Sequence, residues 1–109
     1  MTRTECVITI GDILVQIDTL RGSISPDMQE RTVLDEIRDR LDRIQAQLSR
    51  EVFDANTTAW QDAANGVAQL NTAVNRTIND MARSASMFEA IKKSVFTIDS
   101  LFQLAAKTV

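Results

Sequence analysis

Few of the 109 residues carry side chains that could perform catalysis. The sequence has no histidine, which removes the Glu-x-x-His motifs of di-iron bundles, histidine-based zinc sites and the Ser-His or Cys-His pairs of nucleophilic enzymes. The single cysteine, Cys6, then has no histidine to activate it and is expected to be a small buried apolar residue. Gly11, Gly22 and Gly66 are too far apart to form a phosphate-binding loop. We therefore expect a protein that is not an enzyme and holds no metal or cofactor.

The carboxylates are also poorly placed for acid–base catalysis. Between residues 27 and 43, acids precede arginines at a spacing of four in the pairs Asp27/Arg31, Glu36/Arg40 and Asp39/Arg43. On a helix such pairs contribute only a few tenths of a kcal/mol each. No two acids converge at an apolar position where burial would tune a pKa. This stretch therefore predicts a solvated, charged helix face.

The residues best suited to binding lie between positions 60 and 79, where the polar side chains are mostly neutral amides and hydroxyls. An ordinary exposed helix face usually carries Glu and Lys, which have higher helix propensity. Amides and hydroxyls can hydrogen-bond a partner without the desolvation cost of a charge. The candidate partner-binding residues are Asn65, Gln69, Thr72, Asn75, Arg76 and Asn79, with Trp60 as a large anchor at one end.

Plainer interpretations stand beside this one. A neutral polar face can be ordinary solvated surface, and a tryptophan at a helix start is more often a residue at the edge of the core. The N-terminal half of the helix predicted over residues 57–84 contains the small residues Ala59, Ala63, Ala64, Gly66 and Ala68. These either form a docking strip for a partner helix or allow another helix of this chain to approach, with Trp60 closing the end of the bundle. The sequence leaves both alternatives open.

The fold class depends on residues 5–22, ECVITIGDILVQIDTLRG. The β-branched residues around Gly11 fit a β-hairpin with a type II′ turn. At helical spacing the same stretch has one narrow polar stripe, made of Glu5, Thr9, Asp12, Gln16 and Thr19. Thr2 followed by Glu5 matches a capping box, and Gly22 after Arg21 is typical of a left-handed residue that ends a helix. We predict a helix over residues 3–21, the most buried of the chain, with the hairpin as the alternative.

Three further helices are predicted from apolar spacing, over residues 26–53, 57–84 and 86–106. The apolar positions of the second are Leu34, Ile37, Leu41, Ile44 and Leu48, which form a coiled-coil-like heptad seam. Those of the third are Ala59, Ala63, Val67, Leu70, Val74, Ile78, Met81 and Ala85. Those of the fourth are Phe88, Ile91, Val95, Ile98, Phe102 and Ala105.

Local residue types predict where these three helices begin. Ser25 is expected to cap the second helix, with Pro26 at its first position. Capping boxes are predicted at Thr58/Gln61 and Ser86/Glu89.

The composition supports an all-α fold. Three glycines and one proline leave little material for the turns of a β-sandwich, and 44% hydrophobic residues suffice for one core. We expect one domain over residues 1–109, a small antiparallel bundle of about four helices. The positions beside the second seam are Arg38, Arg40, Gln45 and Gln47, which lack the alternation of acids and bases that would pair two identical parallel helices. They predict an acidic neighbour, for which the first helix, with Asp12 and Asp18, is the candidate.

Charge and hydropathy argue against two classes of partner, nucleic acid and the interior of a membrane. A net charge of −3 has the wrong sign for nucleic acid, and no segment is apolar for long enough to span a membrane. The absence of a signal-peptide pattern and the lone cysteine favour the cytoplasm, with secretion by a route without a signal peptide left open.

We therefore expect a bacterial-type cytoplasmic module, a regulator, inhibitor or secretion adaptor, that binds another protein through a helical face. The alternatives are a structural homo-oligomer, whose second and fourth helices complete the core across subunits, and a helical protein weakly attached to a lipid or granule surface through its first helix.

Overall fold

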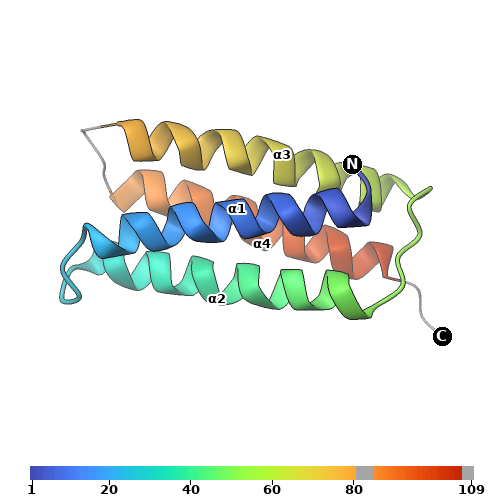
Figure 1. Cartoon of the computed structure of the whole chain (residues 1–109), viewed down its shortest axis with the longest axis horizontal. Coiled ribbons are helices and arrows are strands. Elements are labelled where there is room, and N and C mark those ends of the chain that lie inside the picture. The colour runs from blue at the N-terminus through green and yellow to red at the C-terminus, as the bar shows by residue number, and fades with distance from the viewer. Residues whose placement is uncertain (81–84, 107–109) are drawn as a thin grey trace.

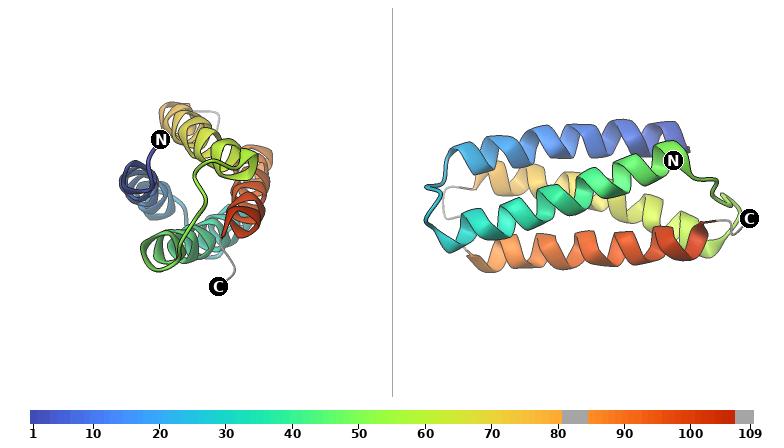
Figure 2. Two further views of the ribbon diagram at one scale, coloured as in Figure 1. Left: turned by 90° about the vertical axis from the view of Figure 1, so that its right-hand side faces the viewer. Right: turned by 90° about the horizontal axis from the view of Figure 1, so that it is seen from below.

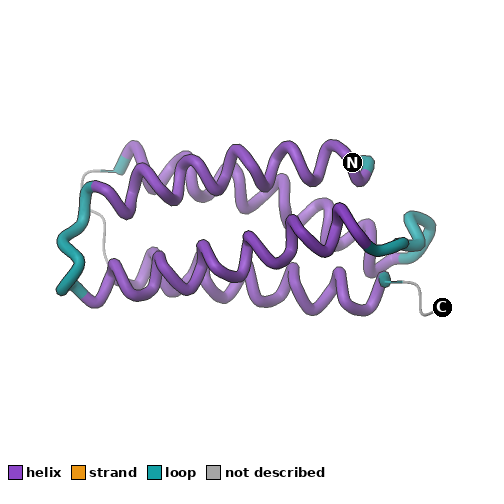
Figure 3. The backbone as a smooth tube through the Cα atoms, turned by 60° about the horizontal axis from the view of Figure 1, so that its bottom comes forward, coloured by secondary structure: helices purple, strands orange, loops and turns teal. Residues whose placement is uncertain are grey.

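The computed structural model describes residues 1–80 and 85–106. It contains four α-helices: α1 (Arg3–Gly22), α2 (Gln29–Arg50), α3 (Thr58–Asn79) and α4 (Ala85–Ala105), shown in Figure 1. The molecule measures 43 × 21 × 20 Å, so it is one helix long and two helices wide. The predicted all-α bundle is confirmed, and residues 3–22 form one helix rather than a hairpin (Figure 3).

Each helix packs against two neighbours, and the order around the bundle axis is α1, α2, α4, α3 (Figure 2). Helices that are consecutive in the chain run antiparallel. As a result α1 and α3, which are neighbours in the bundle, run in the same direction, and so do α2 and α4 (Figure 1). Residues 51–57 cross the end of the bundle from α2 to α3, which lie diagonally opposite each other (Figure 2).

Capping side chains fix the starts of two helices. The capping box predicted at α1 is present: Thr2 Oγ1 accepts a hydrogen bond from the Glu5 amide (3.1 Å), and Glu5 Oε1 accepts one from the Thr2 amide (3.1 Å). At α3 the cap is Thr57, one residue before the predicted Thr58, and its hydroxyl accepts from the Trp60 amide (3.2 Å). These contacts satisfy amides that have no partner within a helix.

The boundaries of α2 differ from the prediction at both ends. The helix begins at Gln29 rather than residue 26, because residues 25–28 form a turn in which the Met28 amide donates to the Ser25 carbonyl (3.0 Å). It ends at Arg50 rather than residue 53, because the backbone becomes extended at Glu51 and the Asp54 amide then donates to the Ala105 carbonyl (3.1 Å).

Two other predicted boundary signals are wrong. Gly22 does not have a positive φ; it is the last residue of α1, and Ser23 follows in a right-handed conformation with its hydroxyl bonded to the Leu20 carbonyl (2.8 Å). Ser86 lies inside α4, which begins at Ala85, so it is not the predicted cap. The third helix ends at Asn79 rather than at residue 84, because the backbone becomes extended at Asp80. Of its predicted seam, Ala85 belongs to α4 instead, and Met81 lies outside the described residues.

The apolar seams converge on one core. The predicted seam residues of α2 and α4 are all buried, and Cys6 is buried among them, where desolvation raises the pKa of its thiol. The prediction that α1 is the most buried helix is wrong: it has six buried residues, against seven each in α2 and α3. In a bundle two helices wide every helix keeps an outer side, and on α1 that side exposes Ile8 (60%) and Val15 (67%).

Candidate interaction surface on α3 and α4

The predicted binding residues on α3 do not form one continuous site. Asn65 and Gln69 are exposed and line a groove of about 710 Å³ between α3 and α4. The other residues lining the groove are Asp62, Gly66, Leu70, Ala73, Lys93, Ser94, Thr97, Ile98 and Leu101. The groove therefore has walls from two antiparallel helices, and α3 supplies only one of them.

The remaining polar candidates, Thr72, Asn75, Arg76 and Asn79, are also exposed but lie further along α3. With Asp80 they surround a shallow, open depression that no residue of another helix lines. Two of these side chains bond locally: Asn79 Nδ2 donates to the Asn75 carbonyl (3.0 Å) and the Thr72 hydroxyl to the Ala68 carbonyl (3.4 Å). This end of α3 has the features of ordinary solvated surface.

Trp60 belongs to the core. Its side chain is 4% exposed, and its ring centroid lies 5.5 Å from those of both Phe53 and Phe102. The three rings close the end of the bundle that residues 51–57 cross. Trp60 is therefore not available as an exposed anchor, in agreement with the plainer of the two interpretations of this residue.

The small residues of α3 mainly allow other helices of the same chain to pack closely against it. A Cβ atom on Gly66 would lie 2.8 Å from Ile98 Cγ1, so the Ile98 side chain of α4 packs directly against α3 at this position. Ala63 and Ala64 are buried as well. The internal explanation of the small-residue strip therefore holds for these residues, and the buried Leu70 and Ile98 line the resulting groove.

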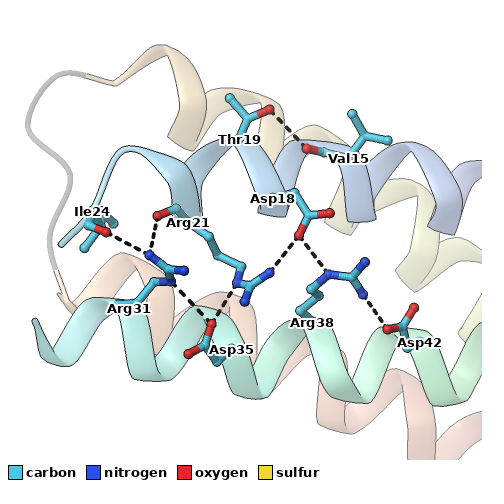
Figure 4. Close-up of polar contacts among 9 residues, drawn as sticks. All are labelled: Val15, Asp18, Thr19, Arg21, Ile24, Arg31, Asp35, Arg38 and Asp42. Atoms are coloured by element: carbon cyan, nitrogen blue, oxygen red, sulfur yellow. Dashed lines mark hydrogen bonds and ion pairs between the residues drawn. The ribbon is translucent and has the colours of Figure 1, made fainter. Parts of the chain in front are cut away.

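Charged side chains join α1 to α2 (Figure 4). Asp18 accepts hydrogen bonds from Arg38 Nε (2.7 Å) and Arg21 Nη1 (3.0 Å). The first helix therefore supplies an acidic neighbour to the α2 seam, as predicted, through Asp18, whereas Asp12 forms no ion pair within the described residues. Arg21 Nε also donates to Asp35 (2.7 Å), and Arg31 donates to the carbonyls of Arg21 and Ile24. These hydrogen bonds and ion pairs hold α1 and α2 together near the turn that connects them.

Ion pairs also join the parallel helices α2 and α4. Arg40 donates to Asp99 (2.8 Å), and Lys92 pairs with Glu36. Gln47 and Gln103 exchange amide hydrogen bonds of 3.1 and 2.8 Å, and the Arg40 guanidinium also lies 4.4 Å from the ring centroid of Phe96.

These contacts correct the predicted pairing within α2. Arg31 pairs with Asp35 rather than with Asp27, and Arg40 with Asp99 rather than with Glu36. For Asp39 and Arg43, the described residues contain no ion pair between the two.

The groove between α3 and α4 differs from these interfaces. Between residues 58–76 of α3 and 88–105 of α4, no side-chain hydrogen bond or ion pair joins the two helices. Even α1 and α3 are linked, through Gln16 Nε2 and Asn71 Oδ1 (3.1 Å). The polar groups beside this groove, Asp62 and Lys93 among them, are therefore not engaged by the neighbouring helix.

The groove residues contributed by α4 were not predicted. Lys93, Thr97 and Leu101 follow one another at a spacing of four, which places them on one side of α4 next to its apolar seam. That spacing is the signal that could have identified them, but its meaning depends on knowing that α4 lies beside α3.

Acid should weaken the α1–α2 contact. Partial burial by itself raises the pKa of Asp18, but hydrogen bonds from Arg38 and Arg21, together with their charges, outweigh it and leave the pKa below its ordinary value. Because the folded-state pKa is lowered, the stabilisation is present above the ordinary pKa of about 3.9 and is lost as the pH falls through the folded-state value. The carboxylate is 44% exposed, so solvent screening limits the contribution to less than about 1 kcal/mol.

We therefore expect Asp18→Asn to lower the urea midpoint at pH 7 and to make little difference near pH 2. Asp12→Asn, on the same helix and without an ion pair in the described residues, is the control and should have no such pH-dependent effect. An Asp18→Asn effect that persists at low pH would show that the interaction with the arginines is not its cause.

Comparison of the sequence with models of known protein families, with curated proteins and with solved structures finds no match. Within residues 1–80 and 85–106, no three His, Cys, Asp or Glu side chains gather in a way that could hold a metal ion. In that same part of the chain, no helix has the length and apolar character needed to cross a bilayer.

Proposed function

We propose that the protein is a non-enzymatic interaction module that binds another protein through the groove between α3 and α4, as a cytoplasmic regulator, inhibitor or adaptor. One observation carries this proposal. Side-chain hydrogen bonds or ion pairs cross each of the other three interfaces, whereas none crosses this groove between residues 58–76 of α3 and 88–105 of α4. Unengaged amides and charges around an apolar strip provide the mixed polar and apolar contacts that protein interfaces use.

The core gives no support to the homo-oligomeric alternative. In that alternative a second copy supplies the surface against which α2 and α4 bury their apolar seams. Within one chain α2 and α4 already pack against each other, and their seams are buried.

Affinity capture from the native source tests the proposal. The groove variant Asn65→Lys/Gln69→Lys should lower the yield of the captured protein at least about tenfold, since it introduces two charges that a docked partner would have to desolvate. The matched control is Thr72→Lys/Asn79→Lys, which makes the same change in charge on the same helix outside the groove and should leave the yield unchanged.

Both variants should keep the parent's circular dichroism and melting temperature, because all four positions are exposed. A groove variant that folds normally and recovers the same protein at the parent's yield would contradict the proposal. Loss of capture only in the control variant would place the binding surface at the other end of α3.

A further inference from the structure

The charges beside the groove indicate what kind of partner element fits it. We propose that the groove binds an amphipathic α-helix of the partner, with a basic residue near Asp62, an acidic residue near Lys93, and apolar residues between them on the same face. This inference rests on the proposed function and specifies the partner of the same site.

The two charges lie toward opposite ends of the groove. The Ile98 side chain lies directly against Gly66, which gives the register of the antiparallel helices α3 and α4. Asp62 precedes Gly66 by four residues, and Lys93 precedes Ile98 by five. Because the helices run in opposite directions, these offsets add, and at 1.5 Å per residue the charges are separated by roughly 13 Å along the groove.

Neither charge is neutralised within the described part of the chain. Lys92, the residue next to Lys93, pairs with Glu36, and Asp99 pairs with Arg40. On the side of α4 that faces α2, these two charges are therefore neutralised by residues of α2. On the groove side, neither Asp62 nor Lys93 forms an ion pair with any residue of 1–80 or 85–106. The groove is therefore acidic at one end and basic at the other.

A helix suits this groove better than an extended segment. Ala73, which is exposed, and Leu101, which is half-buried, make part of the lining apolar, so it offers few partners for the backbone amides and carbonyls of an extended chain. A helix satisfies these groups internally. On a helix, residues seven or eight positions apart lie on one face about 10–12 Å apart, which approximates the separation of the two charges. Asn65 and Gln69 lie between the ends and can hydrogen-bond polar side chains beside the apolar ones.

Synthetic helical peptides of about 16 residues test this inference without the natural partner. Three peptides differ only at two sites seven residues apart, which carry Lys and Glu, Glu and Glu, or Lys and Lys (the Lys/Glu, Glu/Glu and Lys/Lys peptides). All three carry leucine three and four residues after the first of these sites, so that apolar side chains lie between the two charges. Titration into ¹⁵N-labelled protein, followed by NMR, measures both the site and the affinity. For the parent protein we expect the Lys/Glu peptide to bind about two- to fivefold more tightly than the others, the range given by exposed ion pairs, with shifts at groove residues.

Charge reversal of the protein should exchange the preferences. Asp62→Lys should favour the Glu/Glu peptide, and Lys93→Glu the Lys/Lys peptide, each by a similar factor. Asp12→Lys on α1 and Arg76→Glu beyond the groove make the same changes in charge elsewhere and should retain the Lys/Glu preference. Preferences that do not follow the substitutions, or no groove shifts with the Lys/Glu peptide, would overturn the inference.

The two proposals can fail separately. If the peptides show no charge preference while Asn65→Lys/Gln69→Lys still abolishes capture of the native partner, the groove is a binding site but its occupant is not such a helix. If that double variant leaves capture unchanged, the proposed function fails whatever the peptides do.

Discussion

Ile13→Asp is expected to unfold the protein. Ile13 is 0% exposed and lies in the core formed by all four helices. An aspartate there either ionises without a partner, at a cost of several kcal/mol, or leaves a protonated carboxyl group without a hydrogen bond. A domain of this size has a total stability of only about 5–15 kcal/mol, so most of the chain should lose its helical structure. Far-UV circular dichroism at 25 °C measures that loss directly.

Ile8→Asp is the matched control, because it makes the same substitution on the outer side of the same helix. Ile8 is exposed to solvent, so the charge stays hydrated and the free energy of unfolding should change by no more than about 0.5 kcal/mol. If Ile13→Asp melted at the temperature of the parent, α1 would not contribute to the core and the four-helix bundle would be incorrect.

The sequence specifies the helices well because periodicity and capping agree. Leu34, Leu41 and Leu48 recur at a spacing of seven and are all buried as expected. For residues 5–22 the β-branched residues also fitted a hairpin, and the Thr2/Glu5 capping box correctly favoured the helix. Apolar residues on several sides of α1 predict more burial than the structure has. Neighbours on two sides cannot cover a whole helix, which leaves Ile8 and Val15 exposed.

The ion pairs show why tertiary neighbours are hard to predict from spacing. Glu36 and Arg40 fit a pair within one helix, but α2 and α4 run side by side in the same direction and bring Lys92 and Asp99 to these residues instead. The link between Asp18 and the second helix was predictable because helices joined by a short turn pack antiparallel. No comparable rule identified α4 as a neighbour of α2.

Only the α3 side of the groove could be predicted from the sequence, because the α4 side depends on which helices are neighbours in the bundle. Neutral amides on a helix predict Asn65 and Gln69 as binding residues, and both line the groove. Lys93 and Thr97 belong to it only because α4 packs beside α3, and α4 had no unusual composition to mark them. Residue type likewise could not decide whether Trp60 was exposed, since tryptophan is common in both cores and interfaces.

Trp60→Ala should destabilise the protein by about 3–5 kcal/mol, the range for removing a buried tryptophan. The substitution removes the ring contacts to Phe53 and Phe102 and leaves a cavity at the end of the bundle. Because Phe53 belongs to the segment that crosses from α2 to α3, this crossing should also lose its attachment to the core. Urea unfolding followed by circular dichroism gives the loss, and Trp60→Phe should lose less because it keeps an aromatic ring.

Phe96→Ala serves as the comparison, since Phe96 is 38% exposed and its contact with the Arg40 guanidinium is worth only about 0.5–1 kcal/mol.

Trp60→Ala also separates the role of the tryptophan in core packing from a role in binding. Under conditions where Trp60→Ala remains folded, it should capture the native partner as the parent does, because the indole lies beneath the surface rather than beside the groove. A Trp60→Ala variant that kept the parent's stability but lost the partner would show instead that the tryptophan acts as a binding anchor.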